Sequence, residues 1–128
     1  MTKYSNTKKK RLLIFIVAYN AEKTIAEVIT RIPKDLSNKY DISILIIDDA
    51  SEDSTFEISK SLMNENSTPF PIITLKNPLN QGYGGNQKIG FFYAIKHKFD
   101  IVALIHGDGQ YAPECLNELL EPINKNIT

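Results

Sequence analysis

The sequence predicts an α/β fold in which helices flank a mainly parallel, Rossmann-like twisted sheet. Two observations support this prediction. Four short apolar runs rich in β-branched residues recur along the 128 residues, and such runs are typical of strands buried on both faces. A segment with helical features follows each run, and this alternation implies parallel pairing through right-handed crossovers.

The first strand–helix unit begins at residues 12–17 (LLIFIV), a continuous apolar run that we expect to form a buried strand. Asn20 is expected to cap the following helix, because asparagine side chains satisfy free backbone N–H groups there. Pro33 should end that helix, since the residue before a proline is pushed away from helical geometry. The helix carries one apolar stripe, formed by Ile25, Val28, Ile29 and Ile32.

The second unit places two acids at the end of a strand. Residues 42–47 (ISILII) form the strand, Asp48 and Asp49 follow it, and Ser51 is expected to cap a helix that runs to about Asn64. Successive strand residues point to opposite faces, so at most one acid enters a given crevice. We favour Asp49, because acids at such turns commonly contact a nucleotide base or ribose. The alternative is that both acids only solvate the turn and cap the helix.

The third unit contains a glycine-rich loop at residues 77–86, after a short strand at 72–75 that we place near a sheet edge. The loop leads into a helix from about 85 to 98. Its glycines allow close backbone approach, and Lys88 adds charge to a helix end that attracts anions. An ordinary flexible loop is the alternative. The loop is not a P-loop, and no GxGxxG follows the first strand, which disfavours a dinucleotide-binding fold. The helix residues expected to face the sheet are Ile89, Phe92 and Tyr93.

The fourth unit delivers polar groups directly after a buried strand at 101–105. In open α/β sheets ligands bind outside the carboxyl ends of the strands, where His106 and Asp108 lie. Asp108 is a candidate ligand for Mg²⁺ or Mn²⁺ beside a diphosphate. His106 is a candidate second ligand, better suited to Mn²⁺. The alternatives are a plain Asp-Gly turn and a histidine hydrogen-bonded to the backbone.

The last expected helix starts at Pro113 and Glu114 and closes at Pro122. Its apolar stripe consists of Leu116, Leu119, Leu120 and Ile123. No further strand follows, so one flank of the sheet would be unpaired and open to self-association. We therefore expect a fragment, or one half of a longer enzyme.

The composition excludes several classes of protein. Fifteen basic and fifteen acidic residues balance to a formal net charge of zero, which gives no support for nucleic-acid binding. The single cysteine, Cys115, excludes an internal disulfide and a cysteine-cluster zinc site, and we assign it to core packing. No apolar run approaches the length of a membrane helix, and the apolar run after the amino terminus does not lead into a cleavage site. We expect a basic flexible tail at residues 1–10, a nucleotide-binding unit at 11–128 and a cytoplasmic location. His97, between two lysines, should be solvated.

Four motifs in order resemble the amino-terminal, nucleotide-binding half of a family 2 glycosyltransferase with the GT-A fold. They are VAYNAEKTIAEVI, IIDDASEDST, NPLNQGYGGNQKIGFFYAI and HGDGQYAPE. The last resembles the family's metal-binding D-x-D followed by Q-x-x-P-E. The resemblance spans about residues 11–123 and is strongest to enzymes that charge polyprenyl phosphates, such as dolichyl-phosphate mannose synthase. Four ordered motifs are far more specific than any single one.

The resemblance implies a nucleotide-diphospho-sugar donor (UDP- or GDP-linked), Mg²⁺ or Mn²⁺, and inverting sugar transfer, with a polyprenyl phosphate as acceptor. Asp108 matches the last acid of D-x-D, whereas His106 replaces the first, so this motif has one carboxylate fewer than the family's pattern. The catalytic base would lie beyond residue 128, and in the full-length protein the enzyme could be membrane-associated. The candidate nucleotide-binding residues are Ala18, Tyr19, Asn20, Asp49, Gly84, Lys88 and Gly107.

Two other classes of protein are alternatives. A phospho-receiver domain has a similar length and paired aspartates, but its aspartate pair follows the first strand, whereas Asp48 and Asp49 follow the second. A non-catalytic relative of the same fold could use the crevice for binding alone.

Overall fold

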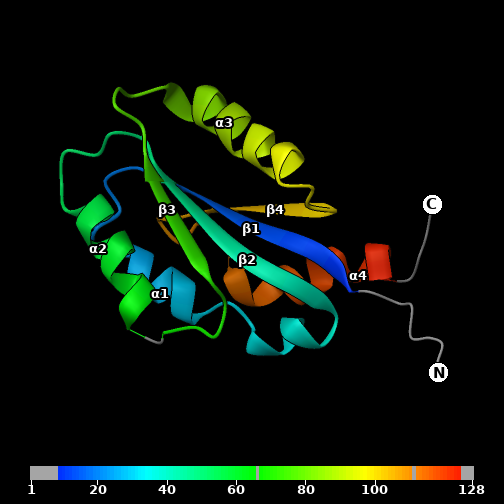
Figure 1. The fold of residues 1–128 in the computed structure, drawn as a ribbon. Helices are drawn as coiled ribbons and strands as arrows, with labels where there is room; N and C mark the ends of the chain where they lie inside the picture. Colours follow the sequence, from blue (N-terminus) through cyan, green and yellow to red (C-terminus); the bar gives the residue numbers. More distant parts are fainter. Residues whose placement is uncertain (1–8, 66, 111, 125–128) are drawn as a thin grey trace.

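The computed structural model describes residues 9–65, 67–110 and 112–124, and its strands form one parallel sheet with the order β3-β2-β1-β4 (Figure 1). This confirms the predicted α/β class and the edge position of the third strand. The strands are β1 (Lys10–Ala18), β2 (Tyr40–Asp48), β3 (Ile72–Lys76) and β4 (Ile101–His106). The helices are α1 (Ile25–Thr30), α2 (Thr55–Ser61), α3 (Gly82–Lys96) and α4 (Leu116–Asn124), with short 3-10 turns at Lys34–Asn38, Leu62–Asn64 and Pro113–Cys115.

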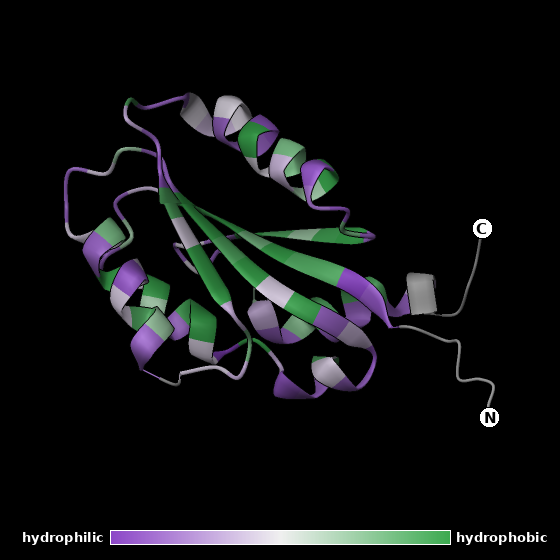
Figure 2. Ribbon diagram, in the orientation of Figure 1, coloured by the Kyte–Doolittle hydropathy of each residue, from purple (hydrophilic) through white to green (hydrophobic). Residues whose placement is uncertain are grey.

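The sheet has a hydrophobic core on each face, as parallel sheets require. Alternate residues of β1 and β2 point toward α1 and α4 on one face, where the predicted stripe of α1 is fully buried. The other residues of these strands pack under α3, which covers its face alone among the described helices (Figure 1). In Figure 2 the central strands are almost continuously hydrophobic.

The faces of α3 differ from the sequence prediction. The helix begins at Gly82, and its buried residues are Asn86, Gly90 and Ala94. Phe92 is 67% exposed and points away from the sheet, and Ile89 is also exposed, so both assignments were wrong. Tyr93 does pack against the core beneath α3. The reason is close approach, because the edge of the Phe15 ring occupies the space that a side chain at Gly90 would need.

Three of the predicted helix boundaries were also wrong. Asn20 has a φ of 48° and does not cap α1, which is preceded by Thr24. Ser51 lies three residues before Ser54, the residue that precedes α2, and its side chain binds Asp48 instead. Pro122 lies inside α4 rather than at its end.

The structure describes only part of the tail predicted at residues 1–10. Residues 1–8 of the expected tail are outside the described residues, whereas Lys10 already pairs with Tyr40 in the sheet. Among the described residues, no helix combines the length and apolar character needed to cross a bilayer.

Candidate functional site

The carboxyl ends of three strands meet at one edge of the sheet. In the parallel register Ala18 of β1 lies beside Asp48 of β2, and Val17 lies beside His106 of β4. The loops that follow these strands therefore leave the sheet side by side, as expected for a ligand site in an open α/β sheet.

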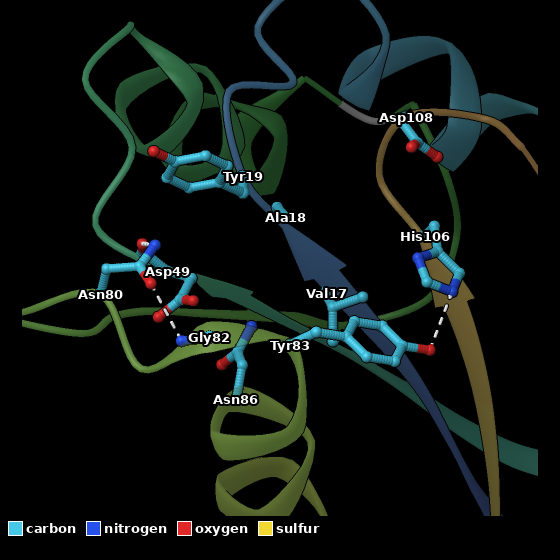
Figure 3. Close-up of a pocket in the computed structure, with 10 residues that line it drawn as sticks. All are labelled: Val17, Ala18, Tyr19, Asp49, Asn80, Gly82, Tyr83, Asn86, His106 and Asp108. Atoms are coloured by element: carbon cyan, nitrogen blue, oxygen red, sulfur yellow. Dashed lines mark hydrogen bonds between the residues drawn. The ribbon is translucent and has the colours of Figure 1, made fainter.

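A cavity of about 280 Å³ opens at this edge. Figure 3 shows Asp49, Asn80 and Tyr19 on one side of it and His106 and Asp108 on the other, with the amino end of α3 between them. The full lining consists of Val17, Ala18, Tyr19, Asp49, Asn80, Gly82, Tyr83, Asn86, His106 and Asp108. The acids that follow the second and fourth strands thus share one cavity.

Asp49 is held rigidly by the segment that leads into α3. Its carboxylate oxygen Oδ1 accepts hydrogen bonds from the side chain of Asn77 (2.8 Å) and from the backbone N–H of Gln81 (2.7 Å). Its backbone carbonyl accepts a third from Asn80 (3.0 Å). Asp49 is only 5% exposed, so these bonds compensate for the burial of the carboxylate.

Asn86 extends this network into the sheet. It is 2% exposed, accepts from Asn77 Nδ2 (3.1 Å) and donates to the carbonyl of Ile47 (3.3 Å). The amino end of α3 is thereby tied to β2 beneath the cavity floor. A buried polar network of this kind fixes one geometry because every lost partner is costly.

The loops after β1 and β2 hold each other through reciprocal hydrogen bonds. The N–H of Asn20 donates to Ser51 Oγ (2.8 Å), and the side-chain oxygen of Asn20 accepts from the N–H of Glu52 (3.0 Å). The N–H of Ala21 donates to the buried hydroxyl of Thr55 (2.8 Å). Asn20 therefore links the two loops through hydrogen bonds, which explains its left-handed backbone conformation. Its neighbour Tyr19 faces the cavity.

Asp53 completes the same pair of loops. It accepts from the hydroxyl and N–H of Thr55 and from the N–H of Glu22. Burial raises its pKa, but the hydrogen bonds from Thr55 and Glu22 outweigh burial and hold the pKa of Asp53 below its ordinary value. The loop pair is therefore tightest when this carboxylate is ionised.

His106 is paired with Tyr83 across the cavity. The rings are stacked with a centroid separation of 5.3 Å and an interplanar angle of 13°, and the Tyr83 hydroxyl lies 3.3 Å from His106 Nε2. Tyr83 was not predicted as a site residue. The only signal for it was its place within the glycine-rich loop, where the sequence drew attention to the backbone.

Asp108 is exposed, and its Oδ1 accepts a hydrogen bond from the N–H of Gln110 (3.0 Å). Among the described residues, no group of three or more His, Cys, Asp or Glu side chains could hold a metal ion by itself. In Figure 3 the His106 ring points toward Tyr83 rather than toward the Asp108 carboxylate. A single carboxylate fits an ion that takes its remaining ligands from water and phosphate oxygens, as Mg²⁺ commonly does. The donor set is therefore compatible with a metal bound together with a diphosphate.

The segment that carries Asp108 is fastened at both ends. Gly107 packs so closely that a Cβ there would lie 3.2 Å from Ile25 Cδ1, and its N–H donates to Val17 O (2.9 Å). Further on, Glu114 forms a two-pronged ion pair with Arg31 (2.9 and 3.0 Å). The hydrogen bond from Arg31 lowers the pKa of Glu114, and the same contact raises the pKa of Arg31.

The structure brings together five of the residues singled out from the sequence, namely Ala18, Tyr19, Asp49, His106 and Asp108. It does not place the other four on the cavity wall: Asn20 joins two loops, Gly107 packs behind the cavity, and Gly84 and Lys88 are exposed on α3. The cavity residues that sequence reasoning missed are Val17, Asn80, Gly82, Tyr83 and Asn86.

Several curated proteins are similar to this chain over most of its length. A UDP-N-acetylglucosamine–dolichyl-phosphate N-acetylglucosaminyltransferase of Methanococcus voltae is 32% identical, and the match covers 89% of this chain and 47% of that protein. An undecaprenyl-phosphate mannosyltransferase of Micrococcus luteus is 27% identical (88% and 44% covered). A polyprenol monophosphomannose synthase of Mycolicibacterium smegmatis is 24% identical (90% and 42% covered). The chain thus spans a little under half the length of these relatives.

The fold also matches a solved structure. The crystal structure of S. aureus TarS superposes with a TM-score of 0.60 at 20% identity, covering 90% of this chain and 20% of that one. The expected GT-A-type, Rossmann-like fold is thereby confirmed. The model of the family described as "Glycosyl transferase family 2" matches residues 13–128, which does not support the phospho-receiver alternative. The chain belongs to glycosyl transferase family 2.

Proposed function

We propose that this chain is the donor-binding half of a sugar transferase. It binds a UDP- or GDP-linked sugar with Mg²⁺ or Mn²⁺, and the complete enzyme transfers the sugar, with inversion, to a polyprenyl phosphate. The observation that carries the proposal is that Asp49 and Asp108, which follow different strands, line one cavity.

Asp49 is suited to the nucleoside end of the donor. Among the described residues the hydrogen bonds to its carboxylate reach only Oδ1, so Oδ2 remains able to accept from a ribose hydroxyl or a base N–H. The bonds from Asn77 and Gln81 fix the carboxylate before the ligand arrives, which lowers the entropic cost of binding. Tyr19, half exposed on the same side, offers a ring face for the base.

Asp108 and His106 are suited to the diphosphate end. Asp108 would hold the metal and His106 would contribute an imidazole nitrogen. A metal bound there neutralises the negative charge that builds up on the departing nucleoside diphosphate. The close packing of Gly107 and the ion pair of Glu114 with Arg31 keep Asp108 in place. This matters because small displacements of a charged ligand weaken such a site strongly.

The acceptor and the base complete the reaction outside the described cavity. Two of the relatives named above are named for transfer to dolichyl phosphate and undecaprenyl phosphate, and the third is a polyprenol monophosphomannose synthase, which supports a polyprenyl phosphate as the acceptor here. Among the described residues, Asp49 and Asp108 are the only carboxylates that line the cavity, and both are assigned to the donor. We therefore propose that the base that deprotonates the acceptor lies beyond residue 128.

Calorimetric titration tests the proposal. UDP- and GDP-sugars are titrated into the chain with and without Mn²⁺, and one nucleotide should bind more tightly when Mn²⁺ is present. Asp108→Ala should remove the Mn²⁺-dependent increment. Asp41→Ala is the control, because Asp41 lies at the opposite end of β2. Absence of binding by any nucleotide, or Mn²⁺ dependence that survives in Asp108→Ala, would contradict the proposal. If the full-length protein binds the donor but transfers no sugar, the non-catalytic alternative is correct.

A further inference from the structure

The outer face of α3 has an unusual surface for a helix in contact with water. Ile95 is 75% exposed and Phe92 is 67% exposed, and Ile89 beside them is also exposed. Residues three apart on a helix are neighbours, so the three side chains form one continuous ridge. In Figure 2 hydrophobic and hydrophilic segments alternate along α3.

The ridge does not face the sheet. The sheet side of α3 is formed by Asn86, Gly90 and Ala94, which are spaced four apart and have small or polar side chains. Ile89, Phe92 and Ile95 project opposite this stripe, whereas Tyr93 packs against the core beneath the helix and Phe91 meets the Phe15 ring. A helix that is apolar on both sides is normally covered on both sides.

The surface around the ridge is strongly basic. Residues 82–99 contain three lysines and no aspartate or glutamate, in a chain whose formal net charge is zero. Lys88 and Lys96, both exposed, lie four residues before and after Phe92 and therefore flank it on the helix surface. Exposed Lys98 follows the end of the helix.

We propose that the outer face of α3, defined by Ile89, Phe92 and Ile95 with Lys88 and Lys96, docks on an anionic lipid surface. Apolar side chains that enter the acyl boundary, flanked by lysines that meet anionic headgroups, are the pattern of helices that lie on membranes. A protein partner fits less well, because the centres of protein interfaces are depleted in lysine.

Docking through α3 would also bring the cavity close to the membrane. Gly82, Tyr83 and Asn86 of the same helix line the cavity, so a bilayer against α3 holds the cavity close to the membrane surface. A polyprenyl phosphate presents its phosphate at that surface. This last link rests on the proposed function, whereas lipid binding itself does not.

Vesicle co-sedimentation without nucleotide tests the surface directly. We expect the chain to bind vesicles of two parts phosphatidylcholine and one part phosphatidylglycerol, and to stay in solution with pure phosphatidylcholine. Lys96→Glu should lower the partition coefficient about fivefold or more, from the value of one lysine near an anionic surface. Phe92→Ser and Ile95→Ser should each lower it about tenfold, because each removes a large apolar side chain from the bilayer.

Matched controls lie on the other side of the sheet. Leu119→Ser on α4, where Leu119 is 50% exposed, and Lys39→Glu should leave binding unchanged. Because all of these side chains are exposed, circular dichroism melts should match the parent chain. Failure to bind anionic vesicles, or equal loss in the controls, would overturn the proposal. Sedimentation velocity adds a second criterion: if Phe92→Ser only converts a dimer to a monomer, the face is an interface between copies. Since no nucleotide is present, failure here leaves the donor-binding proposal standing.

Discussion

Gly90→Ala tests the close contact that positions α3. Gly90 faces the ring of Phe15 at the centre of the sheet, and a Cβ there would lie 2.0, 2.1 and 2.5 Å from three ring carbons. Phe15 is fully buried and also meets Phe91 edge-on, with ring centroids 6.0 Å apart, so the ring has little room to turn away. Either the ring or the helix must move.

The expected cost follows from these distances. Overpacking a well-filled core by a methyl group costs roughly 1–3 kcal/mol, and a fully buried ring on a central strand places this case at the upper end. Alanine is the better helix former by about 1 kcal/mol, which offsets part of the penalty. We expect a net loss of about 2 kcal/mol, or roughly 8 °C in melting temperature for a domain of this size.

Urea unfolding followed by far-ultraviolet circular dichroism measures this loss. Gly84→Ala is the matched control within the same helix, because nothing lies within 4 Å of its Cβ position. That control should be neutral or gain up to about 1 kcal/mol. Adding Phe15→Leu to Gly90→Ala should give a coupling energy that offsets part of the clash. Equal unfolding midpoints for Gly90→Ala and the parent chain would refute the packing described for α3.

Two further predictions concern the loops around the cavity. Asn86→Ala removes partners from Asn77 and the Ile47 carbonyl, so it should cost about 1–3 kcal/mol in urea unfolding and weaken nucleotide binding; an unchanged midpoint would show that the network carries no stability. The pKa of Asp53 is lowered on folding, so its stabilisation is present above the ordinary carboxylate pKa and is lost as the pH falls through the folded value. Asp53→Asn should therefore flatten the loss of stability between neutral and acidic pH, and an unaltered pH profile would contradict this.

The strands and their order of appearance could be predicted because each is a continuous apolar run with no competing pattern. The meeting of Asp49 and Asp108 could also be predicted, since the carboxyl ends of parallel strands share one edge. The inward face of α3 could not be predicted, because apolar residues lie on both sides of the helix. The Phe15 ring occupies the space that a side chain at Gly90 would need, so the side that carries Gly90 packs against the sheet.

Residues whose partners are distant in sequence were the other failures. Asparagine is a favoured helix-capping residue, but the side-chain oxygen of Asn20 accepts a hydrogen bond from the N–H of Glu52 in another loop. Tyr83 enters the cavity because His106, 23 residues away, stacks on it. No local pattern records such pairings, which arise only when the loops of separate strands are brought together.

The central claim is that two strand ends bind one ligand, and amide chemical-shift mapping by NMR tests it most directly. Titrating the isotope-labelled chain with UDP or GDP in the presence of Mg²⁺ should shift the amides of Ala18–Tyr19, Asp49 and residues 106–108. All of these shifts should have the same dependence on ligand concentration. In Asp108→Ala the shifts at residues 106–108 should weaken more than those at Asp49. Shifts at one strand end alone, or at neither, would contradict the account.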